Sequence, residues 1–302
     1  MSLSRPTFLL SCCLLFSITL QAQQSPSTPT SVAISDPQAV ALVQRSLAAL
    51  TSGVAVIDVT LTGSAHRIAG SDDETGTVTL EASAAGDSRV DLSFASGNRI
   101  EIRNHSALPL PGTLPPGVPA SAAQTPQPVG EWIGPDGAPH AMANHNIMTT
   151  APWFFPALIL EEVVTSQNCV LSYVGQETLN GQAVLDVSIS QPLVITSGSE
   201  GSVSSAPPGV SIASLTQHLT QVDIYFDSRT SLPVGLAFNA HPDNNALIDI
   251  PTEITFSSYE TVNGIAVPMT LQKYLNNGLV LELQFTNATL NSGLSTSAFA
   301  LQ

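Results

Sequence analysis

The sequence has few cysteines. It contains 3 among 302 residues, and Cys12 and Cys13 fall in an apolar N-terminal stretch that we expect to be removed. Cys169 then stands alone, so an intramolecular disulfide is excluded and burial must hold the fold together. We interpret Cys169 as a small buried residue of a strand, because Val170 and Leu171 follow it and no base or metal-ligand spacing lies nearby.

Basic residues are also scarce. Lys and Arg number 8 against 23 Asp and Glu, the formal net charge is −15, and Lys273 is the only lysine. Such a surface repels phosphate backbones and anionic headgroups, so we predict no nucleic-acid partner and no bulk electrostatic attachment to a membrane. The acidic residues are scattered along the chain, which indicates a solvated surface.

Long apolar runs are missing after the N-terminus, and we therefore predict no transmembrane segment. Residues 1–22 contain Arg5, an apolar stretch from Phe8 to Leu20 and a small residue at the expected cut, which is typical of a secretory signal peptide. A lipoprotein signal that uses Cys12 is the alternative, although the apolar run continues past that cysteine. The pattern predicts export.

The organisation expected after the signal is a single domain over residues 36–302. Residues 23–35 are rich in Ser, Thr, Pro and Gln and predict a flexible leader. Asp36 and Pro37 predict the start of a helix, since Asp can accept hydrogen bonds from free N–H groups and Pro is tolerated at the first helical position. Gly53 predicts its end. A Pro-rich insertion, 106–129, offers little to bury and is expected to be an exposed loop.

The octet ETLNGQAV, which begins at Glu177, recurs as ETVNGIAV at Glu260. Asn-Gly between two alternating runs is the strongest short-range signal for a two-residue hairpin turn. Similar short runs of period two fill residues 54–104 and the C-terminal part, where odd-numbered positions from Ile265 to Leu271 are apolar. The pattern predicts a curved antiparallel sheet with one face turned inward.

Other segments predict a few helices and a further hairpin. Residues 152–164 are apolar almost all round and predict a buried helix with Pro156 in its first turns. A tight hairpin is expected around Pro135-Asp136-Gly137. Residues 197–209 predict a loop, and 212–219 a short helix. The predicted fold class is mainly β with a few helices, that is α+β.

A set of turn motifs carries a family resemblance. A strand ends in Asp227, a Thr-x-x-Pro turn spans 230–233, and Tyr259, Asn263-Gly264 and a strand with Pro268 follow. This combination of motifs resembles the periplasmic lipoprotein-carrier family, the LolA-like and outer-membrane lipoprotein-sorting proteins. The chain is also similar to uncharacterised exported acidobacterial proteins, through the segments DPQAVALVQ, WFFPA and HPDNN.

The resemblance implies an unclosed β-barrel with helices covering its concave face, in which the family's carriers hold acyl chains. It also implies a periplasmic or extracellular location in a Gram-negative bacterium. No specific carrier residue matches position by position, so no functional residue is carried over.

Candidate ligand-lining residues are the apolar side chains expected on the inward face, although apolar residues on an alternating face more often simply fill the core. They are Trp153, Phe154, Phe155, Met269, Leu271, Leu281 and Phe285.

No catalytic residue, metal or cofactor is predicted. His140, His145 and His241 lack the spacing of a zinc site and are interpreted as loop residues that face solvent or cap turns. Their convergence with a carboxylate would favour an enzyme. Adjacent carboxylates and the GVSIA segment at Gly209 lack the context that catalysis needs.

The function expected from these observations is an exported, non-catalytic binding protein that carries or senses a hydrophobic ligand, such as a lipid or a lipoprotein acyl chain. The alternative is an envelope or secreted interaction domain whose core is filled and which has no ligand. The partner of the first would be a lipid or a lipidated protein. The sequence leaves the oligomeric state open.

Overall fold

The computed structural model describes residues 34–107, 127–149, 152–166, 168–191 and 211–302. The expected signal peptide, most of the leader 23–35, most of the insertion 106–129 and the loop 197–209 lie outside these residues. All the described residues belong to one compact unit, Ala33–Gln302.

The strands of the described residues form one antiparallel sheet. Its strands are β1 (Asp58–Ala69), β2 (Asp72–Ser83), β3 (Ser88–Phe94), β4 (Gly97–Ala107), β5 (Gln127–Ile133), β6 (Pro139–Ala141), β7 (Val170–Leu179), β8 (Gln182–Ser190), β9 (Val222–Asp227), β10 (Pro233–Ala240), β11 (Ile250–Val262), β12 (Ile265–Leu275) and β13 (Gly278–Leu290). Their order is β6-β5-β4-β3-β2-β1-β13-β12-β11-β10-β9-β8-β7.

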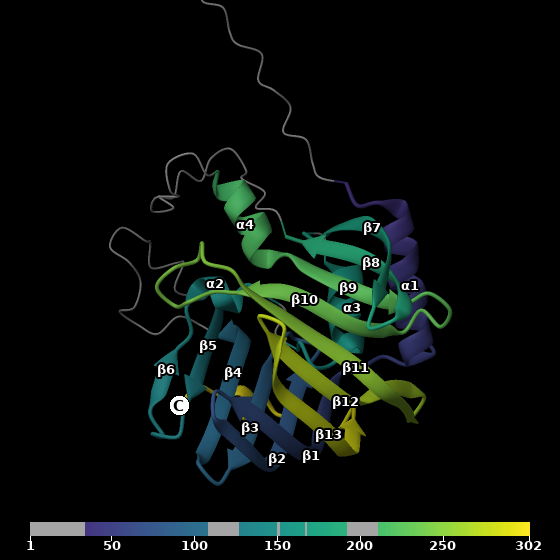
Figure 1. Cartoon of the computed structure of the whole chain (residues 1–302). Coiled ribbons are helices and arrows are strands. Elements are labelled where there is room, and N and C mark those ends of the chain that lie inside the picture. The colour runs from purple at the N-terminus through teal and green to yellow at the C-terminus, as the bar shows by residue number, and fades with distance from the viewer. Residues whose placement is uncertain (1–33, 108–126, 150–151, 167, 192–210) are drawn as a thin grey trace, which may run out of the picture. The chain divides into compact units, whose positions relative to one another are not determined.

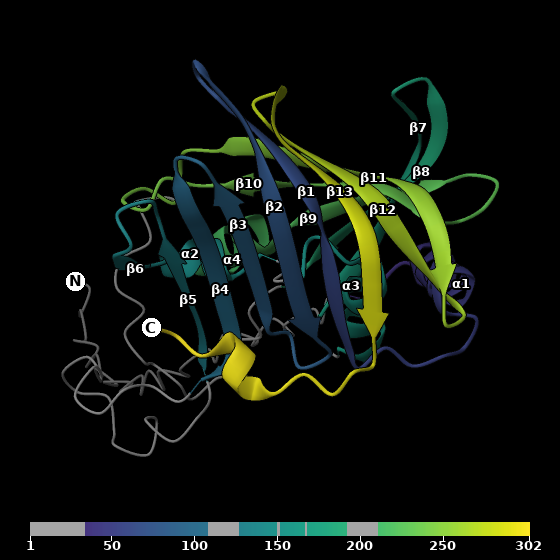
Figure 2. The same cartoon turned by 90° about the horizontal axis from the view of Figure 1, so that it is seen from below.

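This order describes two meanders joined by a single long-range pairing. Strands β1 to β6 follow one another, β7 to β13 do the same, and β1 pairs with β13 in the middle. The sheet bends so that both meanders face the same helices (Figures 1 and 2). Strands β6 and β7 are the two edges and do not pair with each other. The predicted unclosed antiparallel sheet is confirmed.

The helices among the described residues are α1 (Pro37–Thr51), α2 (Asn144–Ile147), α3 (Pro156–Thr165) and α4 (Ile212–Thr220), with a 3-10 turn η2 (Thr296–Phe299) near the C-terminus. None of them combines the length and the apolar character that crossing a membrane requires. Helix α1 begins as predicted: the Asp36 carboxylate accepts from the Gln38 N–H at 2.7 Å, and Pro37 occupies the first turn. The predicted short helix at 212–219 is confirmed as α4.

The apolar segment 152–164 differs from its prediction. Helix α3 begins at Pro156, so Pro156 is its first residue and Trp153, Phe154 and Phe155 precede it. Proline has no N–H to lose at this position, whereas deeper in a helix it would remove a hydrogen bond. The helix is nevertheless buried as predicted, from Pro156 to Leu160 and again at Val163.

The hydrophobic core lies between the concave face of the sheet and helices α1 and α3. One cluster joins inward residues from β1 to β3 and from β7 to β13 with Leu42 and Val43 of α1 and Leu160 of α3. On β12 the inward residues alternate as expected, because Ile265, Val267, Met269 and Leu271 are all buried.

The predicted hairpin turns are confirmed by their backbone angles. Asn180 and Gly181 have φ of 50° and 82°, and Asn263 and Gly264 have 51° and 85°. A two-residue turn with both angles positive matches the twist of the strands it joins, and Asn and Gly adopt such angles at least cost. The repeated octet is therefore two separate hairpins, β7–β8 and β11–β12.

The turn motifs that carry the family resemblance meet in space. The Asp227 carboxylate accepts from the Thr230 N–H at 2.6 Å and from the Thr230 hydroxyl at 2.8 Å, which closes the β9–β10 turn. The Tyr259 hydroxyl donates to the Pro233 carbonyl at 2.8 Å and so joins β11 to that turn. Pro268 lies opposite Tyr259 in the β11–β12 ladder and is buried, and the β12–β13 ladder starts only at Thr270. These residues stabilise the fold.

We expect Tyr259→Phe to lower the free energy of unfolding by about 1–2 kcal/mol, because the Pro233 carbonyl would lose its donor. Burial raises the pKa of the Tyr259 phenol, so the hydroxyl remains a donor over the ordinary pH range. Urea denaturation measures the change. Tyr274→Phe is the control, since its hydroxyl donates only to the Gln272 side chain among the described residues, and an equal loss in both variants would contradict the assignment.

Candidate ligand cavity on the concave face

The predicted lining residues come together in the core. Trp153, Phe154 and Phe155 precede α3, Met269 and Leu271 lie on β12, and Leu281 and Phe285 lie on β13; none is more than 8% exposed. Helix α3 and the segment before it thus belong to the core on the concave side. Whether these residues contact a ligand stays a prediction.

A cavity of about 280 Å³ remains where the first meander faces β12 and β13. Its walls come from β3, β4 and β5 and the turn after β5 on one side, and from Trp153, Lys273 and Leu281 on the other. Val90, Leu92 and Leu281 make it largely apolar. Ligand pockets typically measure ~300–1,000 Å³, and this cavity lies just below that range, with room for one short apolar chain.

Lys273 is the polar group that distinguishes this cavity. It continues the inward row of β12 two residues beyond Leu271, and its Nζ lies 4.9 Å from the centroid of the Trp153 ring. Burial lowers the pKa of Lys273, Glu101 acts in the opposite direction, and Arg103 adds to the lowering. Among the described residues, Lys273 forms no hydrogen bond and no ion pair within 4.0 Å.

The neighbouring arginines, by contrast, are already paired with carboxylates. Arg103 is buried and contacts Glu101 at 2.9 Å, while Arg99 lies 3.4 Å from Glu74. Burial acts to raise the pKa of Glu101, but Arg103 and Lys273 outweigh it, so the pKa is lowered and the carboxylate stays ionised. The unpaired ammonium of Lys273 is thus the basic group here that is available to an anion.

Both tryptophans of the chain line this cavity. The sequence contains 2 tryptophans, Trp132 on β5 and Trp153 before α3. Trp132 stacks on His140 with ring centroids 4.2 Å apart and is 40% exposed. The indole N–H of Trp153 is buried and has no hydrogen-bond partner among the described residues. Because an indole N–H can only donate, it would suit an oxygen atom of a ligand.

Sequence reasoning found Trp153 and Leu281 but missed Trp132 and Lys273. A signal existed for Lys273, because it is the only lysine and occupies the next odd position of an alternating strand. No signal existed for Trp132, which lies beside Glu101 only through the pairing of β4 with β5.

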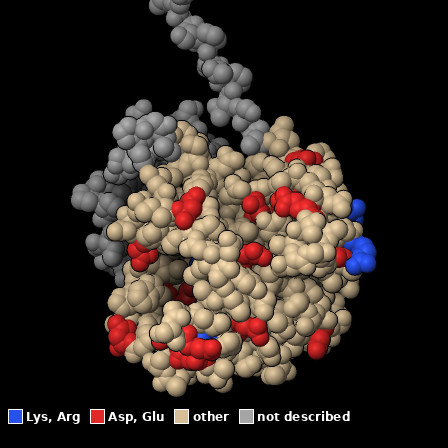
Figure 3. All heavy atoms as spheres, in the orientation of Figure 1, with Lys and Arg blue, Asp and Glu red and all other residues tan. Residues whose placement is uncertain are grey.

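Acidic side chains are scattered over the face drawn in Figure 3, where basic ones are few, as the composition predicts.

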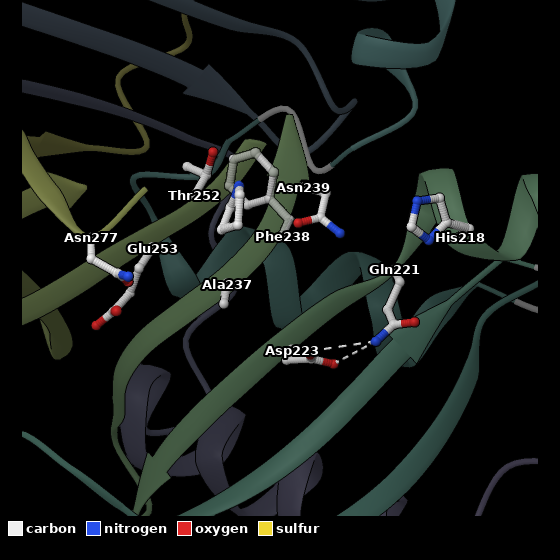
Figure 4. Close-up of a pocket in the computed structure, with 10 residues that line it drawn as sticks. His218, Gln221, Asp223, Ala237, Phe238, Asn239, Thr252, Glu253 and Asn277 are labelled. Atoms are coloured by element: carbon white, nitrogen blue, oxygen red, sulfur yellow. Dashed lines mark hydrogen bonds between the residues drawn. The ribbon is translucent and has the colours of Figure 1, made fainter. Parts of the chain in front are cut away.

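A second depression, of about 460 Å³, lies over β9 to β11 (Figure 4). It is lined mostly by polar groups, among them Asp223, Glu253 and Asn277, and the Gln221 amide donates to Asp223 at 3.2 Å. Burial raises the pKa of Glu253. The polar lining of this second depression does not suit an apolar ligand.

The histidines divide into two groups. His140 lies beside Trp132 and Asp136. His145 and His241, by contrast, have ring centroids 5.8 Å apart, and His218 lies 5.7 Å from His241. Burial lowers the pKa of His241, while the Ile248 carbonyl and Asp249 act in the opposite direction. The sequence did not predict this second group.

Comparison with known proteins adds information on the fold. No family model and no curated protein matches the chain. Among solved structures, it is similar to an outer membrane lipoprotein-sorting protein domain from Vibrio parahaemolyticus, with 12% identity over 87% of this chain and 96% of that chain and a TM-score of 0.48. A LolA superfamily protein from Nitrosomonas europaea shows 8% identity over 87% and 97%, with a TM-score of 0.45.

A DUF1329 family protein from Desulfovibrio piger is also similar, with 11% identity over 88% of this chain and 98% of that chain and a TM-score of 0.48. The family that the turn motifs resemble is therefore among the structural matches. At such identities and scores the likeness concerns the course of the chain and carries no argument about function. The grouping with acidobacterial proteins stays a prediction.

Proposed function

We propose that the protein is an exported, non-catalytic binding protein that holds one apolar chain of an anionic amphiphile in the cavity between β3–β5 and β12–β13. A lipid or a lipoprotein acyl chain has this chemistry. The observation that carries the proposal is Lys273, which forms no ion pair within 4.0 Å among the described residues although it lines a largely apolar cavity. Burial of the chain would provide the affinity, at roughly 25 cal/mol per Å² before ordering costs, and no cofactor is required.

The charges around the cavity support an anionic head group. An ammonium in an apolar site is costly unless a partner neutralises it, and Glu101 is already engaged by Arg103 at 2.9 Å. The Trp153 N–H would supply a second donor. A longer chain would need space that α3 now fills, so we propose that the segment 153–155 and α3 move away from the sheet when such a ligand enters.

Matched ligands test the role of Lys273. We expect decanoate to bind and Lys273→Met to weaken its binding about tenfold, because a hydrogen bond to a charged group is lost. Decanol, which has the same chain without the charge, should bind both proteins equally. Quenching of tryptophan fluorescence measures the binding, since Trp132 and Trp153 both line the cavity.

Arg45→Met is the control variant, because it removes the same charge from an exposed position of α1. It should bind decanoate like the wild type. If Lys273→Met and Arg45→Met have equal effects, the anion is not bound by Lys273. If neither decanoate nor decanol binds, and native mass spectrometry of gently purified protein shows only the mass of the chain, the alternative of a filled interaction domain replaces the carrier.

A further inference from the structure

A cluster of possible metal ligands lies outside the ligand cavity. It joins His218 of α4 to His241 and Asp249, which lie between β10 and β11 (α4, β10 and β11 are labelled in Figure 1). The His218 Nε2 is 2.9 Å from the Asp249 Oδ1, and the His241 Nδ1 is 3.5 Å from the same oxygen. One ligand atom from each residue lies within 4.8 Å of the other two.

His241 supplies a second, independent observation. Its side chain is 0% exposed, yet its Nε2 has no hydrogen-bond partner among the described residues. The Nδ1 lies 3.1 Å from the Ile248 carbonyl oxygen, which can only accept, so the proton belongs on Nδ1. The Nε2 atom then carries a free lone pair and is buried. A donor hydrogen bond from Nδ1 to a carbonyl with a free Nε2 is how metal-binding histidines are held.

The backbone around His241 is fixed by Asn146 of α2. The Asn146 side chain donates to the His241 carbonyl at 2.8 Å and accepts from the His241 N–H at 3.0 Å. His145 is close as well, but its Nε2 lies 3.0 Å from the Pro242 carbonyl oxygen, and we do not count it as a ligand. The cluster is therefore held between α2, α4 and the β10–β11 connection.

We propose that His218, His241 and Asp249 bind one divalent transition-metal ion of the zinc class. Imidazole and carboxylate groups are ligands of such ions, and soft thiolate ligands are absent from the cluster. A tetrahedral zinc ion with bonds of ~2.0–2.1 Å separates its ligand atoms by about 3.3 Å. The His218 Nε2 and the Asp249 Oδ1 are 2.9 Å apart, close to this separation, and one ring nitrogen of His241 lies within 4.8 Å of both.

The position of His218 leaves one side of the ion open. His218 also lines the polar depression over β9 to β11, where its ring stands at one end (Figure 4). Water or a polar ligand in that depression would complete the coordination. The ion would also tie α4 to the β10–β11 connection. The proposal departs from our expectation from sequence that the chain holds no metal, and it is independent of the proposed lipid cavity.

Metal titration of the chelator-treated full chain tests the site. We expect saturable binding of one Zn²⁺ or Co²⁺ per chain, seen by calorimetry, with a visible Co²⁺ absorption band typical of tetrahedral coordination. His218→Gln and Asp249→Asn should each weaken binding by at least about tenfold. These side chains are 38% and 41% exposed, so their replacement leaves the core intact, and circular dichroism checks the fold.

His66→Gln is the matched control, because His66 and Asp73 form a surface pair at 2.6 Å that is not among the possible metal-ligand groups found in the described part of the chain. It should bind metal like the wild type. The site is refuted if the wild type shows no saturable binding, or if His218→Gln and Asp249→Asn bind as tightly as His66→Gln.

Discussion

Asp227→Ala is expected to lower the free energy of unfolding by about 3 kcal/mol, because it removes a buried acceptor and leaves several donors unpaired. Asp227 is 5% exposed. Its carboxylate accepts from the N–H groups of Arg229 and Thr230, from the Thr230 hydroxyl and from the Gln182 amide, which belongs to the neighbouring β8. Chemical denaturation measures the loss.

The same contacts predict how stability depends on acid. Burial acts to raise the pKa of Asp227, but the hydrogen bonds from Thr230, Gln182 and Arg229 outweigh it and lower the pKa from 3.8 to about 2. The folded state therefore holds this proton less tightly than the unfolded state does. The stabilisation is complete above the unfolded pKa and is lost as the pH falls through about 4 to about 2. Asp227→Ala should reduce this part of the acid sensitivity.

Asp73→Ala is the control for Asp227, since the Asp73 side chain is 72% exposed and pairs with His66 at the surface. Its free energy of unfolding should stay within about 0.5 kcal/mol of the wild type. Equal losses in the two variants would show that Asp227 does not hold the β9–β10 turn.

Asp186→Asn is expected to raise the free energy of unfolding at pH 8 by about 2 kcal/mol. Asp186 is 5% exposed on β8, and its Oδ1 has no hydrogen-bond partner among the described residues. Burial, with Asp223 and Glu177, raises its pKa from 3.8 to about 7. Converted fully to free energy, this pKa difference corresponds to about 4 kcal/mol of destabilisation. Relaxation of the protein around the charged carboxylate reduces the measured change in the free energy of unfolding.

The sign of this effect is opposite to that of Asp227. The folded state binds the Asp186 proton more tightly than the unfolded state, so the destabilisation is absent below about pH 4 and grows until about pH 7. Asp186→Asn should therefore gain stability at pH 8 and very little at pH 4. Thermal or urea unfolding at both pH values measures the difference. An equal gain at both would mean that the amide packs better and that ionisation of Asp186 is not the cause.

Local chemistry explains why the fold was predictable. Asn180-Gly181 and Asn263-Gly264 need positive φ for their turns, and only a few residue types tolerate it. Alternation on β12 was enough to identify its inward face, because successive side chains of a strand point to opposite faces. The start of α3 was misplaced, since an apolar segment extends on both sides of Pro156 and does not mark its own first turn.

The sites depended on contacts that no local pattern records. His218, His241 and Asp249 are close because α4 and the β10–β11 connection meet, and His218 and Asp249 were not singled out from the sequence. The cavity also needed the pairing of β4 with β5 to bring Trp132 beside Glu101, opposite Trp153 and Lys273.

The sequence by itself determined the antiparallel strands, the hairpin turns, the cap of α1 and the acidic surface, because each depends on residues close together in the chain or on composition alone. Tertiary structure alone decided that β1 pairs with β13, that α3 packs into the core and that a small cavity lined by the only lysine remains. Side-chain volumes and long-range pairing set these features, and both depend on how distant segments pack in three dimensions.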